Sequence, residues 1–164
     1  MVLHSMKKFL IILMVLTFTG CAHVVSQEIR DTIDPDLSTE ELFKDPDSFK
    51  GKNAVLGGII IDSRNTKEGT YIEILQKPLN YRGIPKYIDL SYGRFIVLSP
   101  GFVDTAVFSR GRAVTCAGEI IGKKVLPLDE IEYPYVLIKS KELHLTELSY
   151  RMPVNIGIGV WGSF

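Results

Sequence analysis

Short apolar segments recur between residues 52 and 148, several contain glycines, and polar turns such as residues 62–69 separate them. The expected strands lie at residues 54–61, 70–75, 87–90, 94–98, 112–121 and 133–148. Glycines inside such segments, here Gly57, Gly58 and Gly118, mark bulges or sharp bends in a sheet. Short, bent strands at fairly regular intervals predict a mostly β fold, a small barrel of five to six strands.

One short helix is predicted before the strands. The run Ser38-Thr39-Glu40-Glu41 matches a capping box, in which the Ser38 hydroxyl accepts a hydrogen bond from the Glu41 amide. The helix should reach about Lys44 and stop at Asp45-Pro46, because the residue before a proline avoids the helical conformation.

The N-terminal residues have the order of a secretory signal peptide. Lys7 and Lys8 precede the apolar run 9–16, and small residues lead to Cys21. The run is too short for a spanning helix, which needs about 20 apolar residues. Phe18-Thr19-Gly20-Cys21 is similar to the lipobox of bacterial lipoproteins, in which the cysteine thiol is acylated. The alternative is an ordinary signal peptide that ends by chance at a cysteine.

The chain then divides into four predicted parts. A lipoprotein signal peptide covers residues 1–20, a lipidated tether 21–36, the β domain 37–150, and an apolar, glycine-rich tail 151–164. The tail alternates apolar residues with polar or small ones and ends at Phe164, so it is expected to act as an accessory strand or a contact segment.

Charge argues against a nucleic-acid partner. The chain has 19 basic and 19 acidic residues, and loss of residues 1–20 removes two lysines and no acid, so 17 − 19 leaves a net charge of −2. A protein of this charge has no electrostatic attraction to phosphates. The expected membrane contact is through the N-terminal lipid instead.

Few residues of this sequence have the type and spacing expected of a reactive or metal-binding site. If Cys21 is acylated, Cys116 is the remaining thiol, and its strand-like neighbours favour a buried small side chain over a reactive one. His23 and His144 stand apart from each other and from any ligand cluster, so no metal site or cofactor is predicted. His144 is expected to be a strand residue with a polar tip.

Asp129, Glu130 and Glu132 cluster in one loop, where carboxylates more often keep a loop solvated than perform acid–base work. No catalytic residue is assigned, and an enzyme is not expected. Binding is the stronger alternative, because barrels can hold oligosaccharides on aromatic side chains. The tyrosines lie at positions 71, 81, 87, 92, 133, 135 and 150. The simpler interpretation is that most of them pack in the core or at its rim, and the ligand-binding residues stay unassigned.

Two spaced motifs resemble the Slp family of bacterial outer-membrane lipoproteins. Gly51-Lys52 followed by Gly57-Gly58 is similar to the segment that enters the family's first strand, and the run from Gly111 to Gly118 is similar to a later one. The resemblance implies an OB-like barrel, no established catalytic activity, and an association with starvation or stationary phase. Ala22 after the cysteine favours the outer membrane over the inner one, with the domain facing the periplasm.

Two roles follow from this reading. The first is a lipid-anchored protein with a structural or interaction role in the envelope, whose partner is another envelope protein. The second is a periplasmic module that binds a glycan or another small ligand.

Overall fold

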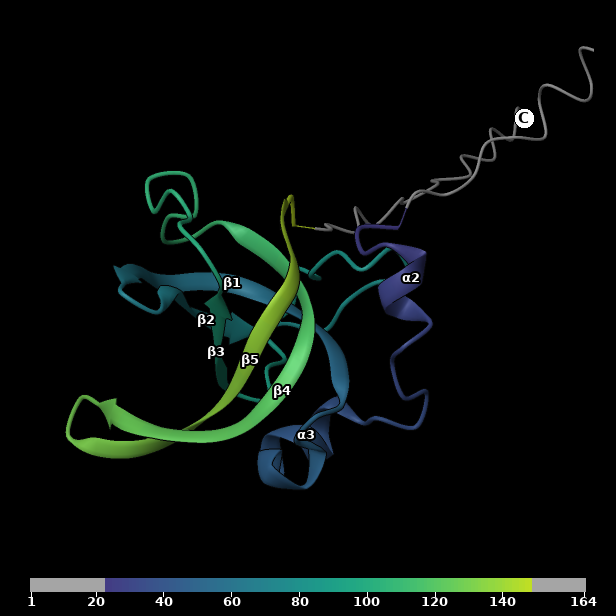
Figure 1. Cartoon of the computed structure of the whole chain (residues 1–164), viewed down its shortest axis with the longest axis horizontal. Helices are drawn as coiled ribbons and strands as arrows, with labels where there is room; N and C mark the ends of the chain where they lie inside the picture. Colours follow the sequence, from purple (N-terminus) through teal and green to yellow (C-terminus); the bar gives the residue numbers. More distant parts are fainter. Residues whose placement is uncertain (1–22, 149–164) are drawn as a thin grey trace, which may run out of the picture.

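The computed structural model describes residues 23–148, which form one five-stranded sheet with short helical segments beside it (Figure 1). The strands are β1 (Asn53–Thr66), β2 (Gly69–Gln76), β3 (Arg94–Ser99), β4 (Ala113–Leu128) and β5 (Ile131–Thr146). Their hydrogen-bonded order is β1-β2-β3-β5-β4, and β4 pairs back with β1, which closes the sheet into a barrel. All pairs are antiparallel except β3 with β5.

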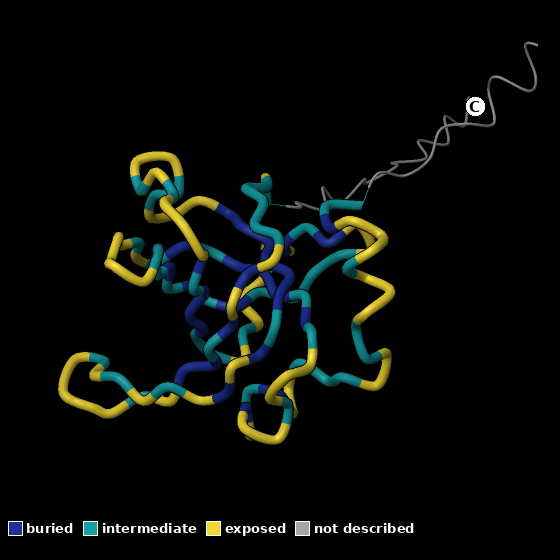
Figure 2. Tube along the Cα trace, in the orientation of Figure 1, coloured by how far each residue is buried: buried dark blue, intermediate teal, exposed yellow. Residues whose placement is uncertain are grey.

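The core lies inside this sheet, because alternate side chains of each strand point inward. In β2, every second residue is buried, including Ile72 and Ile74. The other large buried side chains of the core are Leu42, Leu56, Ile60, Phe95, Val97, Val114, Ile120, Val136 and Ile138. Figure 2 shows the buried segments gathered where the strands cross and the exposed ones at the hairpin ends. The predicted mostly β fold with five strands is confirmed.

Two glycines allow strands to come close together. A Cβ on Gly58 would lie 1.9 Å from the Leu75 carbonyl oxygen, and one on Gly118 would lie 2.2 Å from the Lys139 carbonyl oxygen. A register shift between Ala117 and Gly118 confirms the bend predicted there. In β1 the irregularity falls between Ile60 and Asp62, a little beyond the glycine pair.

The predicted helix is present as α3 (Thr39–Lys44). The Ser38 hydroxyl accepts from the Glu41 amide at 3.5 Å, and the helix ends before Asp45-Pro46, as the capping signals predict. Leu42 is the buried residue of α3 and joins the core. The expectation of a single helix is wrong, because α2 (Gln27–Arg30) and the 3₁₀ helix η2 (Pro46–Phe49) are also present.

Two strand predictions need correction. Residues 62–66 were expected in a loop but continue β1, and only Lys67 and Glu68 separate β1 from β2. This part of the hairpin extends past the core, so it lacks the apolar alternation that marks a buried strand. Residues 87–90 were expected in a strand but lie in a long loop, where Ile88 and Leu90 are exposed.

Residues 23–36, part of the predicted tether, lie against the barrel. Val25 is buried, and its neighbour Ser26 donates from its amide to the Glu142 carboxylate of β5 at 3.0 Å. Asp34 forms an ion pair with Lys52 at 2.8 Å. This segment is therefore packed on the barrel rather than extended away from it.

The signal peptide, Cys21 and the tail 151–164 lie outside the described residues. Within residues 23–148, no helix is long and apolar enough to cross a bilayer.

Candidate ligand-binding trough

Two hairpins project beyond the core on the same side of the barrel, at the left of Figure 1. They are β1–β2 and the long β4–β5 ribbon. A groove of about 270 Å³ lies between them, which we call the trough. Its lining comes from all five strands: Asp62, Arg64, Tyr71, Glu73, Ile96, Leu126, Pro127 and Tyr135. The trough thus presents apolar and aromatic surfaces together with charged groups.

An ion pair fixes the polar side of the trough. Arg94 of β3 donates to the Glu73 carboxylate of β2 at 2.7 Å, with 31% and 24% of the two side chains exposed. Tyr135 donates to the same oxygen at 3.2 Å. The Tyr133 hydroxyl accepts from the Arg94 amide at 3.1 Å. The hydrogen bond to Glu73 raises the pKa of Arg94, so the guanidinium stays charged.

The aromatic rings of the trough are held in defined positions. The rings of Tyr133 and Tyr135 meet edge to face, with centroids 4.9 Å apart, a favourable arrangement for aromatic pairs. Burial, and then the neighbouring carboxylate of Glu73, raise the pKa of Tyr135. Its hydroxyl therefore remains protonated near neutral pH and keeps its hydrogen bond to Glu73.

Cations cover the outer rim. The Lys124 ammonium of β4 lies 4.6 Å from the Tyr71 ring centroid, and the Arg64 guanidinium lies 6.0 Å from it. Both distances are within the range of a cation–π contact. Tyr71 donates to Glu68 at 2.6 Å, and this hydrogen bond raises its pKa. The contact between Lys124 and Tyr71 links the two hairpins across the rim.

This arrangement can hold a polar ligand against the Tyr71 ring and beside fixed hydrogen-bonding groups, while Tyr135 is buried beneath them. Binding sites commonly combine apolar surface with a few such oriented polar groups. The Glu73 carboxylate is engaged by Arg94 and Tyr135, which favours a positioning role over proton transfer. Among the described residues, no three His, Cys, Asp or Glu side chains are grouped to hold a metal ion.

The structure places the other predicted site residues away from the trough. Cys116 is fully buried in the core, and burial raises the pKa of its thiol, which confirms the prediction of a buried small side chain. His144 lies in β5, as expected, with its ring nitrogen 3.0 Å from Glu142. The ring of His23 contacts the backbone of Val25 through a hydrogen bond of 3.1 Å.

The acidic cluster is divided by the structure. Asp129 and Glu130 form the turn between β4 and β5, and Asp129 has a positive φ of 53°. Glu132 belongs to β5. All three side chains are on exposed residues, in agreement with the prediction of a solvated loop.

The tyrosines separate into distinct groups. Tyr71 and Tyr135 line the trough, and Tyr133 adjoins Tyr135. Tyr81 and Tyr87 are exposed in the loop after β2. Tyr92 is exposed and lies near α3, and Tyr150 lies outside the described residues.

Sequence reasoning missed the charged residues of the trough. Alternation in β2 places Tyr71 and Glu73 on the outward face, opposite Ile72 and Ile74, and this signal could have found them. No comparable signal marks Arg94, because it meets Glu73 only through the pairing of β2 with β3.

The barrel, the lipobox and the spaced glycine motifs define a β-domain lipoprotein, and comparison with known proteins assigns its family. The chain belongs to the outer membrane lipoprotein Slp family, whose model matches residues 18–156. It is therefore an outer-membrane protein anchored by lipid.

Two similar proteins illustrate this assignment. The outer membrane protein Slp of Escherichia coli K12 is 26% identical over 160 residues, covering 96% of this chain and 83% of the relative. The uncharacterized lipoprotein YeaY of the same strain is 26% identical over 150 residues, covering 90% and 77%. A solved structure of the Saccharomyces cerevisiae mitochondrial single-stranded DNA-binding protein Rim1 has 9% identity and a TM-score of 0.38, covering 62% of this chain and 100% of Rim1. A likeness this low supports no inference on ligand or fold.

Proposed function

We propose that this lipoprotein is acylated at Cys21, faces the periplasm, and binds a polar ligand of the glycan class in the trough. The observation that carries the ligand proposal is the partly exposed ring of Tyr71 beside the fixed Glu73–Arg94 ion pair in one groove. Sugars offer both ring faces for aromatic contact and hydroxyls for hydrogen bonds. A net charge of −2 after processing disfavours nucleic acid in the same groove.

The barrel is of the OB-like type in this proposal. Five strands, a first strand shared between β2 and β4, and a parallel β3–β5 pair support that description. OB-type barrels bind ligands on the face of their second and third strands, between the loop that joins strands one and two and the loop that joins strands four and five. The trough lies on β2 and β3, and the hairpins ending in those two turns flank it.

The test is calorimetry of the full lipidated chain in detergent micelles with soluble peptidoglycan fragments and chitin oligosaccharides. Tyr71→Ala should weaken binding, because aromatic stacking contributes about 1–3 kcal/mol, which is about 5- to 150-fold in Kd. Tyr81→Ala, an exposed tyrosine outside the trough, is the matched control and should bind normally. Absence of heat with every glycan, or equal affinity of the two variants, would overturn the ligand proposal.

A structural or interaction role in the envelope is the second candidate. Exposed apolar side chains on the β4–β5 ribbon favour it, since Val125 and Ile131 lie on its projecting part. A photo-crosslinker placed at Ile131 in living cells should then capture one envelope protein reproducibly. If the crosslinker at Ile131 captures no protein while the chain binds glycan, the interaction role is rejected and the ligand-binding role of the trough remains.

An association with starvation or stationary phase stays a prediction from the family resemblance. Its test is the amount of this protein in growing and in starved cells. Equal amounts in both would contradict it.

A further inference from the structure

A second exposed surface lies at the other side of the barrel from the hairpin ends. The loop after β2 carries Tyr81 and Tyr87 with 79% and 64% of their surfaces exposed, and Ile88 with 44%. Arg82 and Lys86 lie beside them around the same hollow. We call these five residues the loop face. In Figure 1 this loop is the teal segment near α2, while the hairpins that flank the trough end at the left.

The loop face has an ordered backbone. The Asn80 side-chain oxygen accepts from the amides of Arg82 and Ile84 at 2.9 and 3.0 Å. The Thr115 hydroxyl, buried in β4, donates to the Gly83 carbonyl at 2.7 Å. These bonds fix the turn between Asn80 and Ile84 on the barrel. The tyrosines are therefore presented outward by a fixed loop, at little cost in chain entropy when they make a contact.

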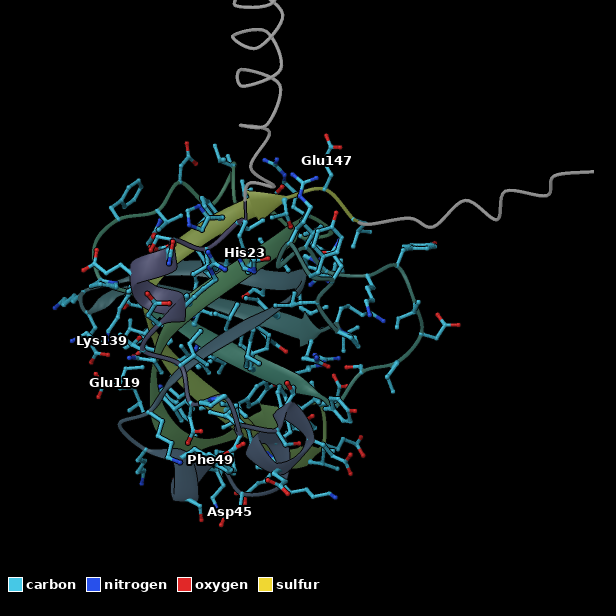
Figure 3. The ribbon with its side chains drawn as sticks, turned by 90° about the vertical axis from the view of Figure 1, so that its right-hand side faces the viewer. His23, Asp45, Phe49, Glu119, Lys139 and Glu147 are labelled. Carbon is cyan, nitrogen blue, oxygen red and sulfur yellow. The ribbon has the colours of Figure 1, made fainter. Side chains whose placement is uncertain are left out.

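The anchored end of the chain lies at this same place. The Val24 amide donates to the Arg82 carbonyl at 2.9 Å. The His23 ring is so close to Gly83 that a Cβ there would lie 2.7 Å from it. Cys21 precedes His23 by two residues, a span of at most about 7 Å. Figure 3 shows His23 and Glu147 toward the end of the molecule opposite Asp45 and Phe49.

We propose that the loop face rests on the membrane that holds the lipid anchor. This inference depends on the proposed acylation of Cys21. Tyrosine rings suit the boundary between acyl chains and headgroups, where the ring is apolar and the hydroxyl stays hydrated. Arg82 and Lys86 can lay their apolar stems along the surface and keep their charges among the headgroups.

Because the lipid already holds the protein at the membrane, a surface as small as the loop face is sufficient to orient the barrel. A lipid attached two residues before His23, which contacts the loop, keeps the face at a high effective concentration near the bilayer. A few interfacial side chains can then set the orientation of the barrel without providing attachment. In this orientation the hairpins that flank the trough point away from the membrane, because they end on the other side of the barrel (Figure 1).

The experiment uses the full lipidated chain in vesicles of phosphatidylethanolamine and phosphatidylglycerol that contain a nitroxide-labelled lipid. Tyr81→Cys carries an environment-sensitive fluorophore, and Phe102→Cys carries the same label as the control. Phe102 is 81% exposed and lies in the loop after β3. Cys116 does not compete for the label, because it is fully buried. The label at position 81 should lose most of its emission to the nitroxide, and the label at position 102 should keep it.

Flotation of the vesicles separates the two proposals. Protein that floats, with equal emission at positions 81 and 102, leaves the anchor intact and overturns the membrane contact. A label at position 81 that is shielded from water but not quenched means that protein covers the face, either a second copy or residues 149–164, which also overturns it. Protein that does not float overturns acylation at Cys21 and the membrane contact together.

Discussion

Replacing Leu42 with alanine should remove a large part of the stability of the barrel. Leu42 is the fully buried residue of α3 and belongs to the core, while its neighbour Phe43 packs against the core from a partly buried position. The change removes three carbons, at about 0.8 kcal/mol each, or about 2.4 kcal/mol of burial. The cavity left behind adds to this, since buried leucine-to-alanine changes cost about 2–5 kcal/mol. We expect a loss of about 3–4 kcal/mol in the free energy of unfolding.

The assay is thermal unfolding of the full chain in detergent, followed by circular dichroism. At about 4 °C per kcal/mol for a domain of this size, Tm should fall by about 12–16 °C. Leu90→Ala is the matched control, because the same atoms are removed from a side chain that is 50% exposed. The control should lower Tm by a few degrees at most. Equal shifts for the two variants would refute the role of α3 in closing the core.

Three further predictions follow from the described contacts. Burial raises the pKa of Glu142, but hydrogen bonds from Ser26 and His144 outweigh it and hold the pKa below 4.5. The carboxylate therefore stabilises the fold above pH 4.5, and this contribution should disappear as the pH falls through the lowered pKa. Protection of the α2 amides from hydrogen exchange, measured relative to the intrinsic exchange rate at each pH, should fall over this range, and in Glu142→Gln it should not change with pH. The thiol of Cys116 should resist maleimide at neutral pH until the barrel unfolds, and modification at the rate of an exposed thiol would contradict its burial. Gly118→Ala should lower the free energy of unfolding by at least about 1–3 kcal/mol, because its Cβ would meet the Lys139 carbonyl oxygen at 2.2 Å; unchanged denaturant unfolding would show that the two strands can separate freely.

The buried parts of the strands were predictable because burial imposes a pattern on the sequence. Ile72 and Ile74 alternate with polar neighbours, and the cap at Ser38 has a local signature in the next three residues. The polar end of β1, residues 62–66, carried no such pattern because it extends past the core. Residues 87–90 carried an apolar pattern, but no strand pairs with them.

The trough was only partly predictable. Tyr71 and Glu73 share one face of β2, a consequence of the two-residue period. Tyr135 comes from β5, and its hydrogen bond to Glu73 joins residues 62 positions apart. The parallel pairing of β3 with β5 brings Tyr135 near Glu73. A pairing between strands so far apart in sequence leaves no local pattern from which it could be predicted.

The sequence by itself determined what depends on neighbours along the chain: the lipobox at Cys21, the capped helix, the strand periods and the family motifs. Tertiary structure decided which strands are adjacent, that residues 23–36 pack on the barrel, and that the loop with the exposed tyrosines Tyr81 and Tyr87 lies beside Val24. The physical reason is that periodicity and capping are local properties of the backbone. The trough and the loop face arise instead from closing the sheet, which joins residues that are far apart in sequence.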